Sequence, residues 1–112
     1  MRYFQTIFLE EAELFISGLE EKTIKKILYN IDLAEQTNDP KLFKKLNDEI
    51  WEFRTRYNGK QIRLLAFWDK SNKSQTLVIA CNGFIKKTDK IPNNEMEKAT
   101  NLKLNYFDNK SQ

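Results

Sequence analysis

A tight β-hairpin is predicted by the pair Asn58-Gly59, which separates two strand-like segments. Both residues tolerate a positive φ angle, as two-residue hairpin turns require. The flanking segments, residues 46–54 and 60–68, are rich in aliphatic and aromatic side chains. A third segment, residues 75–82, carries a nearly continuous apolar run, which is typical of a buried central strand. The three segments together predict an antiparallel meander.

The N-terminal part of the chain predicts one strand followed by two helices. Residues 3–9 are aromatic and β-branched, which favours a strand. Residues 10–19 begin with acidic side chains, which suit the positive end of a helix dipole, and continue with apolar residues at helical spacing. Residues 23–36 form the clearest amphipathic helix, which Pro40 prevents from continuing.

The C-terminal part predicts a loop and a last helix. Residues 83–92 form the loop, and the helix starts after Pro92, where Asn94 and Glu97 resemble a capping box. The tail, residues 108–112, is expected to be frayed. The predicted order β-α-α-β-β-β-α makes residues 1–112 a single α+β domain in which the N-terminal strand and helical hairpin pack on a small antiparallel sheet.

Several classes of protein are excluded by what the sequence lacks. No apolar run approaches the roughly 20 residues that span a bilayer, and no signal peptide is visible, so we expect a cytoplasmic protein without membrane contact. Histidine is absent and Cys81 is the only cysteine, so neither a disulfide within the chain nor a Cys/His metal cluster is expected. The phosphate-loop and dinucleotide-binding glycine motifs are also missing, so we expect no cofactor.

Charge is distributed unevenly along the 112 residues. Residues 1–40 contain four Lys/Arg against eight Asp/Glu, whereas residues 41–112 contain fifteen against eight. The first part therefore has a net charge of −4 and the second of +7. A nucleic acid would bind the basic part. A Lys-rich surface of an ordinary soluble protein would give the same distribution.

Arg63 stands in a strand-like segment whose side chains on both faces are largely apolar. Alternation places it on the face opposite Ile62 and Leu64. An arginine in such a place is costly unless it has a partner. Two interpretations remain open: a structural salt bridge, for example to Glu52 on the neighbouring strand, or contact with a phosphate.

The other cations lie where strands are expected to meet loops. Arg54 and Arg56 lead into the hairpin turn beside Tyr57, and Lys86 and Lys87 follow a Gly-Phe pair. Each set also has a plain interpretation, as a solvated turn or an ordinary charged loop. Taken together, they suit the cleavage of RNA, in which the 2′-hydroxyl attacks the adjacent phosphate and cations stabilise the added negative charge. Without histidine, proton transfer would fall to Tyr57, a lysine, a carboxylate, or a group of the RNA or ribosome.

Four motifs in order resemble the RelE/ParE toxin superfamily, and in particular its phage-derived, HigB-like branch. They are Ile50-Trp51-Glu52-Phe53-Arg54, Gln61 to Phe67, Gly83-Phe84-Ile85-Lys86-Lys87-Thr88, and Ile91-Pro92 with Glu95 to Ala99. The resemblance covers about residues 42–107 closely. It implies two N-terminal helices packed on a small antiparallel sheet.

The resemblance also implies a function and a set of site residues. It implies the toxin of a type II toxin–antitoxin pair, which inhibits translation by cleaving mRNA, often on the ribosome, and is held inactive by a helix-turn-helix antitoxin. The resemblance assigns Arg54, Arg63, Lys86 and Lys87 to the scissile phosphate or the RNA backbone, and Tyr57 and Tyr106 to proton transfer or base stacking. With the other cations of the basic part, we expect Arg54, Arg63, Lys86, Lys87 and Tyr57 to be catalytic and Arg56, Lys60, Lys90 and Tyr106 to bind RNA. Some members of that branch use a histidine in the site, and that histidine has no counterpart in this chain.

Two other functions fit the same sequence. A ParE-like toxin would poison a protein such as gyrase and leave mRNA intact. A plain RNA-binding domain would show salt-sensitive affinity for RNA without cleavage.

Overall fold

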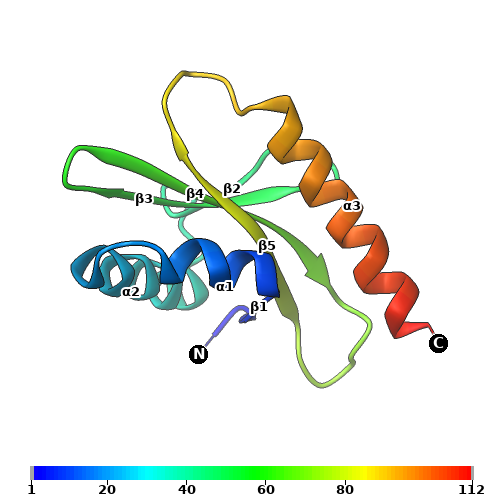
Figure 1. The fold of residues 1–112 in the computed structure, drawn as a ribbon. Coiled ribbons are helices and arrows are strands. Elements are labelled where there is room, and N and C mark those ends of the chain that lie inside the picture. Colours follow the sequence, from blue (N-terminus) through cyan, green and yellow to red (C-terminus); the bar gives the residue numbers. More distant parts are fainter. Residues whose placement is uncertain (1, 112) are drawn as a thin grey trace.

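The computed structural model describes residues 2–111 as one five-stranded sheet with helices on both faces (Figure 1). The strands lie in the order β1-β5-β4-β3-β2, with β1 parallel to β5 and the other pairs antiparallel. The elements are β1 (Gln5–Phe8), α1 (Glu10–Ser17), α2 (Glu21–Thr37), β2 (Phe43–Lys45), β3 (Trp51–Tyr57), β4 (Lys60–Asp69), β5 (Leu77–Lys86) and α3 (Asn93–Lys110).

The predicted α+β class and the antiparallel meander β3-β4-β5 are confirmed. The hairpin turn also has the predicted geometry, since Asn58 has φ 52° and Gly59 has φ 74°. The strand predicted over residues 46–54 is wrong in its first half. There the Asn47 side chain accepts hydrogen bonds from the backbone N–H groups of Glu49 and Ile50, which makes a turn. The short strand β2 was not predicted.

The residues predicted as a loop after position 82 continue β5 as far as Lys86. Lys86 therefore pairs with Gln61 of β4 and belongs to the sheet. Within this pairing the two strands shift register between Leu65 and Ala66, where β5 has one extra residue. Lys86, the first lysine of the motif from Gly83 to Thr88, is therefore the last residue of a strand.

Each face of the sheet has its own apolar core. The α1–α2 hairpin covers one face, where Ile62, Leu64 and Ala66 are buried (Figure 1). Helix α3 crosses the other face, where Leu65 and Phe67 are buried. The predicted alternation along β4 is therefore confirmed.

Gly83 is required by packing on the α1–α2 face. A Cβ atom placed there would lie 2.3 Å from Cδ2 of Phe15 and 2.7 Å from Cδ2 of Leu64. The motif glycine therefore lets α1 approach β5 closely, and it does not need to contact a phosphate.

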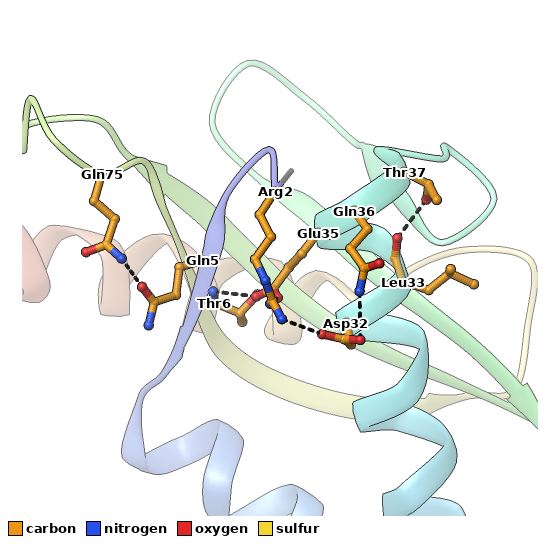
Figure 2. Close-up of polar contacts among 9 residues, drawn as sticks. All are labelled: Arg2, Gln5, Thr6, Asp32, Leu33, Glu35, Gln36, Thr37 and Gln75. Carbon is orange, nitrogen blue, oxygen red and sulfur yellow. Dashed lines mark hydrogen bonds and ion pairs between the residues drawn. The ribbon is translucent and has the colours of Figure 1, made fainter.

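The edge of the sheet at β1 is covered by α2 (Figure 2). The buried carboxylate of Glu35 accepts a hydrogen bond of 2.8 Å from the backbone N–H of Thr6 and also binds the guanidinium of Arg2. Arg2 forms a second ion pair with Asp32, at 3.1 Å. At the opposite side of the sheet β2 pairs only with residues 51–53, so β3 has an open edge from Thr55 onward.

Helix α3 differs from its prediction at both ends. It begins at Asn93 without a side-chain cap, so the predicted capping box of Asn94 and Glu97 is wrong. Its C-terminal end is helical as far as Lys110 where fraying was predicted, and Gln112 lies outside the described residues. Within residues 2–111, no helix combines the length and apolar character needed to cross a bilayer.

Candidate functional site

Two arginines and a glutamate form a buried charge cluster on the sheet face that α3 shares. Arg54 of β3 and Arg63 of β4 lie directly opposite each other, an arrangement in which like charges repel. Glu52 lies between their guanidinium groups, with Oε1 at 3.3 Å from Nε of Arg63 and Oε2 at 3.7 Å from Nε of Arg54. The Glu52 and Arg63 side chains are each 4% exposed, whereas Arg54 is 33% exposed.

Arg63 is held in one orientation by three partners. Besides the Glu52 pair, Nη1 donates to the carbonyl oxygen of Ile62 at 3.2 Å and Nη2 donates to Oε1 of Gln61 at 2.9 Å. Burial lowers the pKa of Arg63, which Glu52 raises and the nearby Arg54 and Arg56 lower further. An arginine remains protonated even so. Of the two interpretations left open for Arg63, the salt bridge to Glu52 is therefore confirmed.

The cluster is not fully satisfied by hydrogen bonds. Nε of Arg54, Nε of Arg63 and Oε1 of Glu52 are buried without a hydrogen-bond partner among the described residues. Unsatisfied polar atoms are costly and uncommon in folded proteins. The cluster therefore concentrates positive charge on rigid strands, and two of its guanidinium N–H groups have no hydrogen-bond acceptor among the described residues.

Strand register aligns four of the predicted site residues on this face. Arg54 and Arg63 form one row, and Arg56, Gln61 and Lys86 form the next row across β3, β4 and β5. Neighbouring strands lie about 4.8 Å apart, so Arg56 and Lys86 stand roughly 10 Å from each other across the sheet. Arg54, Arg56, Arg63 and Lys86 therefore lie on one face of the sheet, and we call these four residues the cationic face.

The remaining candidates lie around the cationic face or away from it. Lys87 follows the end of β5 and is exposed, as is Lys90 in the next loop. Tyr57 and Lys60 pair with each other at the hairpin turn, and alternation from Arg54 and Arg56 puts both on the opposite face. The structure does not bring Tyr57 to the arginine pair.

Tyr106 belongs to a different cluster, at the other end of the sheet. Its hydroxyl donates a 2.6 Å hydrogen bond to Oδ2 of Asp69. Asp69 lies six residues beyond Arg63 on β4, a separation of about 20 Å. Burial and the contact with Asp69 raise the pKa of Tyr106 to about 12, which makes its phenol a poorer proton donor. The structure therefore separates Tyr106 from the predicted site.

Asp69 anchors the C-terminal end of α3 to the sheet, a role that the sequence did not reveal. Its fully buried carboxylate accepts hydrogen bonds from Tyr106, from Lys110 at 2.5 Å and from the Ser71 hydroxyl at 2.6 Å. Burial alone would raise the pKa of Asp69, but these hydrogen bonds outweigh it and lower the pKa. Tyr106 and Lys110 are four residues apart and so lie on one face of the helix, and this spacing was the sequence signal for a shared partner.

Replacing Asp69 with asparagine is expected to lower the free energy of unfolding by about 1–3 kcal/mol at neutral pH, because Lys110 and Tyr106 lose a charged acceptor. The lowered pKa means that this stabilisation exists above the pKa of an unfolded aspartate, about 3.9, and is lost as the pH falls below it. Urea unfolding from pH 3 to pH 7 checks both points, with exposed Asp108→Asn as control. Equal stability of the two variants would contradict the anchoring role.

A groove of about 630 Å³ opens at the free edge of β3. Its walls come from α2 and from β3, and it extends to Arg63. In the described part of the chain, five cations and no Asp or Glu line the groove. The cations are Lys26, Lys41, Arg54, Arg56 and Arg63. The buried Asn30 of α2 donates a 3.2 Å hydrogen bond to Oγ1 of Thr55, which fixes the helix to the strand there.

Comparison with known proteins gives one family. The model described as "Phage derived protein Gp49-like (DUF891)" matches residues 14–103. The match includes every residue of the cationic face and leaves out Tyr106. No curated protein matches the chain significantly.

Proposed function

Because the chain belongs to the Gp49-like family of phage-derived proteins, we propose that it is the toxin of a type II toxin–antitoxin system. In this proposal it is a RelE/ParE-type, HigB-like endoribonuclease that inhibits translation by cleaving mRNA on the ribosome. Its antitoxin partner is a helix-turn-helix protein. The observation that carries the proposal is the Glu52-Arg54-Arg63 cluster, which fixes two guanidinium groups on adjacent strands of the sheet face that α3 crosses.

The chemistry assigned to the site needs no redox or covalent intermediate. The 2′-oxygen attacks the neighbouring phosphorus, the bond from phosphorus to the 5′-oxygen breaks, and the products are a 2′,3′-cyclic phosphate and a 5′-hydroxyl. Arg54 contacts a non-bridging oxygen as negative charge builds up on the phosphate. Arg63, whose guanidinium is fixed by Gln61 and Glu52, adds a second positive charge on the neighbouring strand, which further stabilises the negative charge. Preorganised charges of this kind stabilise the transition state without having to reorient.

Proton transfer is divided between the chain and its surroundings. Lys86, in the same face as Arg56, can donate a proton to the leaving 5′-oxygen, with exposed Lys87 beside it. The proton of the 2′-hydroxyl goes to a group of the RNA or ribosome. This assignment follows from the absence of histidine and from the separation of Tyr106 from the cationic face.

Expression of the protein in a bacterial host tests the proposal. Growth should stop, and incorporation of labelled amino acids should fall before incorporation of labelled thymidine, because translation is the target. Co-expression of an adjacent helix-turn-helix gene, where one exists, should restore growth. A fall in thymidine incorporation first, with induction of the DNA-damage response, would instead support the ParE-like alternative and overturn the proposal.

A further inference from the structure

The groove at the open edge of β3 differs from the cationic face in what it offers a ligand. Lys26 and Tyr29 come from α2 and Lys41 precedes β2, so its outer wall belongs to elements far from the hairpin in sequence. Arg54, Arg56 and Arg63 also line it, so the groove and the cationic face are continuous.

Tyr29 adds a flat aromatic surface to this wall. Its side chain is among the large apolar groups left exposed, at 60%. Nζ of Lys26 lies 5.2 Å from the centre of the ring. An exposed aromatic ring beside a row of cations is the combination with which proteins bind single-stranded nucleic acid, since cations contact phosphates and the ring stacks on a base.

Other features of the groove favour an extended polyanion over a small anion. The groove has a volume of about 630 Å³, and its five cations come from α2, from the segment before β2, from β3 and from β4. The hydrogen bond between Asn30 and Thr55 holds the two walls together, so the groove exists without the ligand. Among residues 2–111 no Asp or Glu side chain lines it, although Asp and Glu are numerous in the N-terminal part of the chain.

We propose that the groove between α2 and β3 binds the single-stranded RNA that flanks the phosphate held at Arg54 and Arg63. Lys26 and Lys41 contact two successive parts of the backbone, and Tyr29 stacks on one base. The inference rests on the proposed function, because the cationic face sets where the strand enters. The inference predicts that the affinity depends on the length of the RNA, because a dinucleotide occupies only the cationic face.

The test measures binding without turnover. The probe is a fluorescein-labelled RNA of about ten nucleotides, within the usual range for single-strand sites, with 2′-O-methyl groups so that it cannot be cleaved. Fluorescence anisotropy is recorded at several salt concentrations for the wild type, Lys26→Ala/Lys41→Ala and Tyr29→Ala. The control, Lys73→Ala/Lys98→Ala, removes two lysines that do not line the groove.

Loss of two phosphate contacts should reduce the slope of log affinity against log salt by about 1.4, because each contact on single strands contributes about 0.7. Tyr29→Ala should weaken binding roughly tenfold, as removal of a stacking ring does. The control should retain the wild-type slope. Affinity for a dinucleotide should be the same in all four proteins.

Each other outcome overturns one specific claim. If the groove variants match the control while the wild type cleaves RNA, the groove inference is wrong and the proposed function stands. If the variants lose RNA affinity but the wild type never cleaves, the groove stands and the nuclease proposal is wrong. If RNA binding is unchanged and only binding of polyglutamate is lost, the groove holds an acidic protein segment, which contradicts the inference.

Discussion

Replacement of Arg54 by alanine is expected to slow RNA cleavage by about a hundredfold to a thousandfold, which is the usual effect of removing one preorganised group that stabilises transition-state charge. Arg54 is the more exposed member of the arginine pair, with a third of its side chain accessible, so in the proposed function it is the one that reaches a phosphate directly. Its ion pair with Glu52, at 3.7 Å, is also the longer of the two. The fold should therefore tolerate the change.

The effect of Arg54→Ala can be separated from unfolding. Cleavage of a reporter mRNA in a translation extract gives the rate, and thermal unfolding gives the stability. Arg2→Ala is the matched control, because Arg2, like Arg54, forms an ion pair with a buried glutamate but lies at the β1 edge (Figure 2). Wild-type cleavage by a folded Arg54→Ala protein would remove this residue from the catalytic set.

Replacement of Glu52 by glutamine is expected to have the largest effect on stability, about 3–5 kcal/mol in the free energy of unfolding. Glu52 is the acidic partner of both arginines, and its loss leaves Arg63 buried with Arg54 directly opposite. Breaking a buried pair costs more than the pair itself contributes, because the remaining charge stays desolvated.

A double variant distinguishes this cause from general damage. In Glu52→Gln/Arg63→Met the buried positive charge is removed together with its partner, and most of the lost stability should return. RNA cleavage should remain low, because Arg63 is absent. Urea unfolding of the two single variants and the double variant measures the coupling. Additive losses would show that the pair is not the source of the effect.

The strands of this fold were predictable from the sequence where a local rule decided the outcome. Asn58-Gly59 fixes the hairpin, and the hairpin fixes the register that places Arg54 opposite Arg63. The salt bridge between Glu52 and Arg63 followed from the same register, because an arginine in an apolar strand needs a partner.

The features that sequence reasoning missed depend on contacts between distant segments. Strand β2 has three residues and no pattern of its own, and it exists because it pairs with β3. The extension of β5 to Lys86 comes from its pairing with residues 61–65 of β4. Tyr106 was assigned to the site from the family resemblance, whereas its partner Asp69 could be found only from the packing of α3 on the sheet.

Mapping of RNA ends in cells expressing the wild-type protein or Arg54→Ala tests the central claim most directly. The wild type should produce internal cuts in translated mRNAs that leave a 2′,3′-cyclic phosphate and a 5′-hydroxyl, and the folded variant should produce few or none. Intact mRNA during a clear growth arrest by the wild type would contradict the account, as would equal cleavage by Arg54→Ala.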